Sequence, residues 1–210
     1  MDLTRFRLNI GGDKIRSAYQ IKQRDTVLFF MGWLYKFSGL KEVLLELARL
    51  NRDGWKCLIV GEGDAYEELK HATHQLNIKD KVIFTGQQPY EEIPKLIAAA
   101  DICMLPADPA EKIMQEIVPI KLYECMAMAK PVISTKLPGV MKEFGEDNGV
   151  VYVDRPEEVV SKAIELIQNG KLQELGKKAR RFVEQNSWDK ITDEFEALLE
   201  EAIRGKKKKL

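Results

Sequence analysis

Six apolar runs of strand length recur along the chain, and they constrain its fold more than any other feature. Each is continuously hydrophobic rather than alternating, which is typical of strands that are covered on both faces. Amphipathic stretches separate the runs; in residues 39–51, for example, Leu40, Val43, Leu44 and Leu47 recur at helical spacing. Because strands and helices alternate, the sequence predicts an α/β fold, a Rossmann-like, doubly wound parallel sheet of about six strands. The runs are residues 26–32, 55–61, 81–86, 101–106, 131–135 and 149–154.

The rest of the chain divides around this core. After residue 154 the strand runs stop, and three consecutive helical patterns predict a helical C-terminal segment. Residues 1–25 are polar and basic with one short helical stretch, and we interpret them as a linker leading into the main domain, residues 26–204. Residues 205–210, GKKKKL, form a basic tail that is typical of a solvated terminus.

Composition and charge exclude several classes of protein. Lys plus Arg and Asp plus Glu both total 33, so the net charge of zero gives no case for a nucleic-acid partner. Cys57, Cys103 and Cys125 lie inside apolar stretches without paired spacing, which indicates buried thiols in a reducing compartment. We find no signal peptide and no apolar run of about 18 residues, so we expect a cytoplasmic protein.

The stretch from Glu116 to Glu124 carries the candidate chemistry. Pro119 suits the first turn of a helix because it lacks the N–H group that would be orphaned there. The amides that follow can then bind an anion with the help of the helix dipole, and Lys121 adds a positive charge. Glu124 would lie one turn inside, where it can accept hydrogen bonds from vicinal hydroxyls such as those of a ribose. Glu116, in the loop before the helix, would lie where a sugar attached to the phosphate projects. Solvated surface charge is the alternative interpretation of the two acids.

Glu116, seven residues, Glu124 and then CMAMAKPVIST resemble the E-x7-E signature of family-four glycosyltransferases and the EAMACGKPVI that follows it. Other segments are similar to family landmarks in the same order, from the linker-like MDLTRF at residues 1–6 to NSWDKITDEF at 186–195. The resemblance implies the C-terminal, donor-binding half of a GT-B enzyme, which consists of two Rossmann-like domains. It implies transfer of a sugar, with retention, from a nucleoside diphosphate sugar (UDP or GDP) to a hydroxyl acceptor.

The same resemblance implies roles for individual residues. Glu116 would bind hydroxyls of the donor sugar, Glu124 the ribose, and Gln88 would lie near the nucleobase. Catalytic residues are expected on an N-terminal acceptor domain of the same enzyme, so the isolated chain is expected to be inactive. The candidate diphosphate contacts are Gly32, Lys36, Ser38, Val118, Pro119, Ile120 and Lys121.

The chain departs from the family pattern in its first loop. The family's G-R-L-x-x-x-K-G supplies Arg and Lys to neutralise the diphosphate, whereas Trp33 and Ser38 stand at these positions. Lys121 has a counterpart in the PSKLYEYMA form of some members, and Lys36 is a second compensating cation. Because of this departure, a non-catalytic nucleotide-binding or partner-docking domain on the same fold is kept as the alternative function.

The expected ligands and partners follow from the resemblance. No Asp-x-Asp motif occurs in the sequence, which favours a donor site without a metal ion. No cofactor is expected, because the nucleotide sugar is a substrate. The expected partners are that nucleotide sugar and the N-terminal domain, with a peripheral contact to a membrane lipid acceptor at the inner membrane face.

Overall fold

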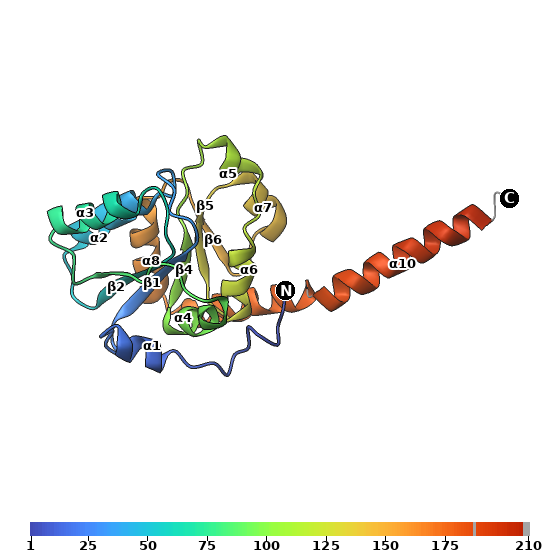
Figure 1. Cartoon of the computed structure of the whole chain (residues 1–210), viewed down its shortest axis with the longest axis horizontal. Coiled ribbons are helices and arrows are strands. Elements are labelled where there is room, and N and C mark those ends of the chain that lie inside the picture. Colours follow the sequence, from blue (N-terminus) through green and yellow to red (C-terminus); the bar gives the residue numbers. More distant parts are fainter. Residues whose placement is uncertain (187, 208–210) are drawn as a thin grey trace.

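A computed structural model describes residues 1–186 and 188–207. Its centre is a six-stranded parallel sheet with the order β3-β2-β1-β4-β5-β6, in which each predicted run forms one strand (Figure 1). This order confirms the predicted doubly wound fold and places its switch point between β1 and β4. The strands are β1 (Thr26–Met31), β2 (Trp55–Val60), β3 (Val82–Phe84), β4 (Ile102–Leu105), β5 (Val132–Thr135) and β6 (Val150–Val153).

Helices cover both faces of the sheet, which is why the strands are hydrophobic on both sides. In β1, Val27, Phe29 and Met31 point into one apolar cluster, while Leu28 and Phe30 point into the other. The first cluster is closed by α4, α6, α7 and α9, and the second by α2, α3 and α8. The helices are α1 (Asp13–Ala18), α2 (Leu40–Leu50), α3 (Tyr66–Gln75), α4 (Ile93–Ala99), α5 (Lys112–Glu116), α6 (Ile120–Ala127), α7 (Pro138–Phe144), α8 (Glu158–Gln168), α9 (Leu172–Gln185) and α10 (Trp188–Lys207), with a 3-10 turn at Tyr90–Glu92.

Residues 1–25 contribute no strand, yet they pack closely on the domain. Phe6 is fully buried and Ile21 is 5% exposed, and both belong to the first apolar cluster. Arg16 of α1 binds Asp101 at 2.8 Å, and the Asp101 carboxylate also accepts the Val27 amide at the start of β1. The segment interpreted as a linker is therefore part of the folded unit.

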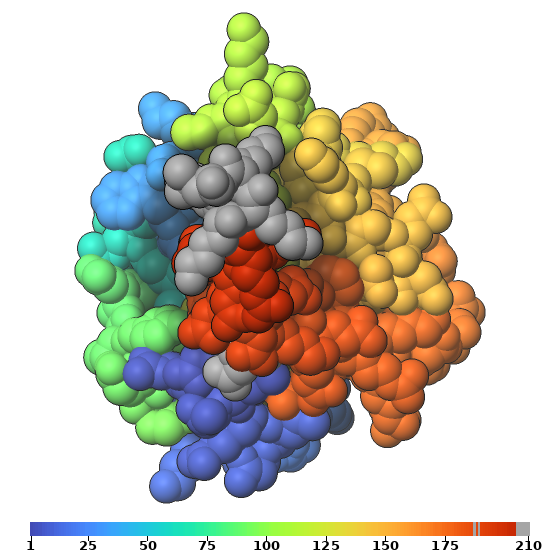
Figure 2. All heavy atoms as spheres, turned by 90° about the vertical axis from the view of Figure 1, so that its right-hand side faces the viewer, coloured from blue at the N-terminus to red at the C-terminus, as the bar shows by residue number. Residues whose placement is uncertain are grey.

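The helical C-terminal segment consists of α8, α9 and α10. The last of these projects away from the body of the molecule, and Figure 2 looks onto its free end. Of the predicted basic tail, residues 205–207 fall within α10, and residues 208–210 lie outside the described residues. Within residues 1–186 and 188–207, no helix is both long and apolar enough to span a membrane.

Candidate functional site

The candidate site lies at the carboxyl ends of β1 and β2, where three predicted turn glycines come together. Gly32 and Gly61 have φ values of 131° and 129°, which glycine adopts readily. The Gly61 amide donates to the Gly86 carbonyl at 2.9 Å, and a Cβ added to Gly61 would lie 2.1 Å from the Gly32 carbonyl oxygen. Glycine at these strand ends therefore allows the loops to approach one another and form the floor of a cavity.

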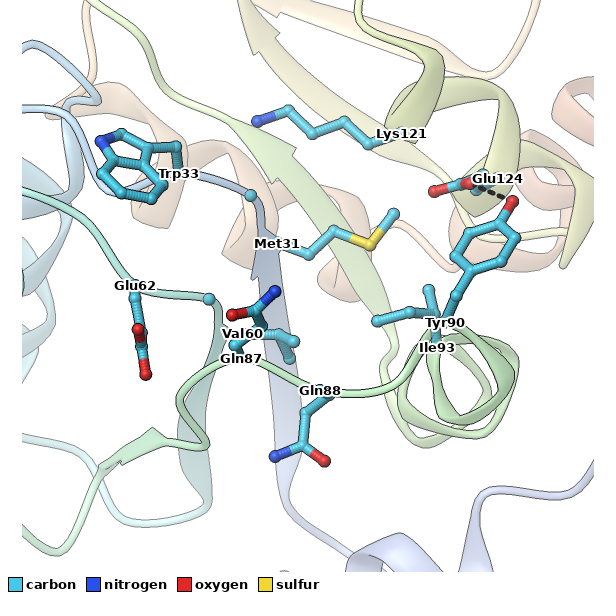
Figure 3. A pocket seen from close by; sticks show the side chains of 12 residues that line it. Met31, Trp33, Val60, Glu62, Gln87, Gln88, Tyr90, Ile93, Lys121 and Glu124 are labelled. Carbon is cyan, nitrogen blue, oxygen red and sulfur yellow. Dashed lines mark hydrogen bonds between the residues drawn. The ribbon is translucent and has the colours of Figure 1, made fainter.

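This main cavity has a volume of about 380 Å³ and lies between the strand ends and α6. Gly32, Gln88, Lys121 and Glu124 line it, so the structure brings four of the predicted site residues together. Figure 3 shows Lys121 and Glu124 projecting from α6 along one wall, with the loop residues Glu62 and Gln87 on the other side. A cavity of this size with a few polar groups is typical of a small-molecule site.

Glu124 lies at one end of the cavity and is 7% exposed. The Tyr90 hydroxyl donates a hydrogen bond to its Oε1 at 2.8 Å, and the Arg5 guanidinium lies 4.6 Å from the centre of the Tyr90 ring. Burial raises the pKa of Glu124, and the hydrogen bond from Tyr90 opposes that shift. Tyr90 thus fixes one carboxylate oxygen and leaves Oε2 as an acceptor for a ligand hydroxyl.

Lys121 lies at the other end, one helical turn closer to the start of α6. Its Nζ is 4.5 Å from the centre of the Phe30 ring and would lie 3.0 Å from a Cβ added to Gly32. Desolvation lowers the pKa of Lys121 to about 8. Within the described chain, no carboxylate lies within 4.0 Å of this ammonium, so its charge is available to an anion in the cavity.

Helix α6 begins as predicted. Pro119 is its N-cap residue, and no side chain in the described chain caps the helix end. Ile120 is 67% exposed and Val118 is half-buried. The first turn of α6 is thus accessible beside Lys121, which is the arrangement that an anion site at a helix N-terminus needs.

The structure does not bring Glu116 into this cavity. The expectation of a loop position was wrong, because Glu116 is the last residue of the short helix α5 and its side chain is exposed. Its backbone packs against α7, where a Cβ added to Gly139 would lie 3.0 Å from the Glu116 carbonyl carbon. The donor-sugar role of Glu116 stays a prediction.

The two first-loop candidates lie apart from each other. Lys36 is exposed and lines a separate hollow with Asp108 and Arg155, so it does not join Lys121. Ser38 is 6% exposed and lines a smaller hollow of about 130 Å³ that also includes Lys121 and Trp33. Aromatic and aliphatic side chains form the rest of this smaller hollow, among them Tyr35, Phe37, Met114, Ile117 and Pro119.

Sequence reasoning missed several residues of the main cavity. Tyr90 carried no signal, since its role depends on a contact with Glu124, which is 34 positions away. Glu62 and Gln87 directly follow glycine-marked strand ends, a position that could have nominated them. Gln88 was predicted, and its Nε2 donates to the Thr85 carbonyl at 2.9 Å, which leaves its amide oxygen as an acceptor.

In the part of the chain that the structure describes, no three His, Cys, Asp or Glu side chains group as metal ligands.

A sheet of this topology, with a cavity at the strand ends and a helix start beside it, defines a Rossmann-like α/β domain. Residues 12–185 match the family of glycosyl transferases, group 1, and the chain belongs to that family. It is 25% identical over 199 residues to the N-acetyl-alpha-D-glucosaminyl L-malate synthase of Bacillus anthracis, covering 92% of this chain and 50% of that one. The chain thus spans about half the length of this curated relative.

Two solved structures share the fold. Alr3699/HepE from Anabaena, in complex with UDP, superposes with a TM-score of 0.79 at 18% identity, over 96% of this chain and 56% of that one. The C-terminal domain of the group 1 glycosyl transferase LpcC from Francisella tularensis gives a TM-score of 0.71 at 20% identity, over 88% of this chain and 97% of that one. At these identities the two structures show the fold alone.

Proposed function

We propose that the chain is the donor-binding domain of a glycosyltransferase that uses a nucleoside diphosphate sugar. The observation that carries the proposal is the order of groups along one wall of the cavity. Glu124 comes first, then Lys121 with the N-terminus of α6, and then the smaller hollow that Lys121 also lines, which matches ribose, diphosphate and sugar in sequence. The UDP bound to Alr3699/HepE supports a nucleotide ligand for this fold.

Each group in this order suits its part of the ligand. The carboxylate of Glu124 accepts hydrogen bonds from vicinal ribose hydroxyls, and Tyr90 orients it. Lys121 and the first amides of α6 neutralise the diphosphate, replacing the Arg and Lys that the first loop lacks. Gln88 presents its amide oxygen to a base N–H group. Glu116 stays a candidate for sugar hydroxyls because its neighbour Ile117 lines the smaller hollow.

Transfer itself would need a second domain that brings the acceptor, since the chain matches only about half of its relative. We therefore propose that the 210-residue chain binds nucleotide and transfers no sugar by itself. Retention of the anomeric configuration is part of the proposal through the family resemblance. The cytoplasmic location and the contact with a lipid acceptor stay predictions.

Calorimetry on the purified chain with UDP, GDP and ADP tests the proposal. We expect saturable binding of at least one of them, and Glu124→Ala should weaken it by about 1–3 kcal/mol, because a charge-assisted hydrogen bond is lost. Glu67→Ala, on the exposed surface of α3, is the matched control and should leave the affinity unchanged. Absence of binding by all three nucleotides at millimolar concentration would reject the proposal, and an unchanged affinity of Glu124→Ala would remove Glu124 from the site.

A further inference from the structure

The smaller hollow lies where the proposed ligand order places the donor sugar. From Glu124 to Lys121 to Pro119, the wall runs toward the start of α6, and Pro119 and Lys121 both line the smaller hollow. Figure 3 shows the Lys121 side chain reaching from α6 toward Trp33, the other residue that the two cavities share. A sugar linked to a diphosphate at Lys121 would therefore project toward this hollow. The inference rests on the proposed function.

The walls of the hollow are unusual for a sugar site because they are mostly apolar. Tyr35 and Phe37 stack with ring centroids 4.7 Å apart, and Met114 and Ile117 face the same space. Such a surface offers few partners for sugar hydroxyls, and burying a hydroxyl without a partner would cost free energy. The walls instead favour an apolar group on the ligand.

The neutral polar side chains in these walls are Ser38 and the more exposed Trp33 and Tyr35. Ser38 is 6% exposed, and its hydroxyl has no hydrogen-bond partner within residues 1–186 and 188–207. The hydroxyl oxygen is not one of the buried unpaired atoms of the described residues, so it is open to the hollow and can bond a ligand that reaches it. It would donate to an acceptor that lies next to an apolar group.

The volume restricts the size of the occupant. The hollow of about 130 Å³ has room for about four water molecules at roughly 30 Å³ each. An apolar cavity of about 150 Å³ holds one benzene ring, so this hollow suits a substituent of a few heavy atoms better than a pyranose ring with all its hydroxyls. A single hydroxyl would leave most of the space in contact with aromatic walls.

We propose that the smaller hollow receives the acetamido group of a 2-acetamido sugar donor. The methyl group packs against Phe37 and Met114, and the amide carbonyl accepts a hydrogen bond from the Ser38 hydroxyl. The sugar ring stays outside, beside Lys121, with its other hydroxyls toward the acceptor side. This assigns Ser38 to the sugar substituent rather than to the diphosphate.

Two sugar phosphates that differ only at C2 test the proposal independently of the nucleobase. NMR titration of the ¹⁵N-labelled chain compares N-acetyl-α-D-glucosamine 1-phosphate with α-D-glucose 1-phosphate. We expect the acetamido compound to bind at least roughly tenfold more tightly, since one apolar group in a hydrophobic pocket is worth about 10–200-fold. The amides of Phe37 and Ser38 should shift with it.

Variants then assign the preference to the hollow. Ser38→Ala should reduce the preference by about 2–10-fold, through loss of one hydrogen bond, while Ser17→Ala on the exposed surface of α1 should keep it. Equal affinities for the two sugar phosphates, or no saturable binding of either, would overturn the proposal. A preference that Ser38→Ala leaves unchanged would also overturn it. If UDP, GDP or ADP still binds in those cases, only this inference fails, whereas absence of all nucleotide binding rejects the proposed function too.

Discussion

Lys121 holds its ammonium over the Phe30 ring, and burial lowers its pKa to about 8. The lysine is therefore largely charged near neutral pH and loses its proton as the pH rises through this value. The buried thiol of Cys125, on the same helix, acts on this pKa electrostatically in the opposite direction. Glu124, three positions along α6, is the nearest carboxylate on that helix and is bonded to Tyr90. Among the described residues that line the main cavity, the positive charge offered to a diphosphate thus comes from Lys121, while Glu62 and Glu124 are its acidic side chains.

Nucleotide affinity should fall with increasing pH above neutrality because of this group. A diphosphate binds the charged form of Lys121, so above pH 8 binding must be accompanied by uptake of a proton. The dissociation constant of the preferred nucleotide should rise by roughly tenfold between pH 7 and pH 9. The terminal phosphate, with a pKa of about 6, is already ionised in this range and adds no slope. Calorimetry in two buffers of different ionisation enthalpy measures both the affinity and the proton uptake.

Lys121→Arg is the informative control for this pH dependence. An arginine stays charged to above pH 12, so the affinity of this variant should be flat between pH 7 and pH 9. Lys79→Met, an exposed lysine at the opposite end of the sheet, should keep the wild-type profile. A flat profile in the wild-type chain would contradict the assignment of Lys121 to the diphosphate.

At the scale of secondary-structure elements, the site depends on how closely β1 and β2 approach at their carboxyl ends. The Gly61 amide bonds the Gly86 carbonyl, and the Gly32 amide bonds the Val60 carbonyl at 3.0 Å. These contacts tie three strand-to-helix turns together beneath the cavity. The geometry requires glycine because the backbones of Gly32 and Gly61 are nearly in contact.

Gly61→Ala should destabilise the chain because of this close approach. Its new Cβ would meet the Gly32 carbonyl oxygen at 2.1 Å, and the φ of 129° is strained for alanine. We expect a loss of at least about 2 kcal/mol in the free energy of unfolding, measured by urea denaturation. Gly11→Ala is the matched control, because nothing lies within 4 Å of an added Cβ there, and it should change stability by less than about 0.5 kcal/mol. Equal stability of Gly61→Ala and the wild type would show that the turn is not constrained in this way.

At the scale of the whole molecule, α10 stands apart from the sheet and its layers (Figure 1). Its apolar side chains recur at helical spacing and are all exposed, from Trp188 at 59% to Phe195 at 59% and Leu198 at 63%. The core clusters contain none of its residues. The stability of the domain therefore resides in the layers up to α9.

Removal of α10 should leave the domain folded. A chain that ends at residue 186 should differ from the full chain by less than about 1 kcal/mol in the free energy of unfolding, since the deleted side chains bury little area. A chain that ends at residue 171, before α9, is the contrasting variant, because Ala179 and Val183 of α9 are fully buried and their loss exposes the core. Urea denaturation of the three chains measures the differences. A loss of more than about 3 kcal/mol from the shorter deletion would mean that α10 packs on the domain.

Local patterns in the sequence were sufficient for the six strands and for the start of α6, but they did not predict the short helices α5 and α7. Six hydrophobic runs became six strands, and Pro119 marked the start of α6, because strand hydrophobicity, helical period and the missing proline N–H act over a few residues. The helix start also named Lys121 and Glu124, and the family resemblance named Gly32 and Gln88; all four line the main cavity. Only the tertiary structure decided that Tyr90 bonds Glu124 and that the Phe30 ring lies against the Lys121 ammonium. It also decided that Ser38 lines the smaller hollow while Lys36 lines a separate one. Finally, it placed Glu116 at the end of α5, outside the main cavity. These contacts join segments far apart in the chain, so packing of the layers sets them, and no pattern within a single segment carries that information.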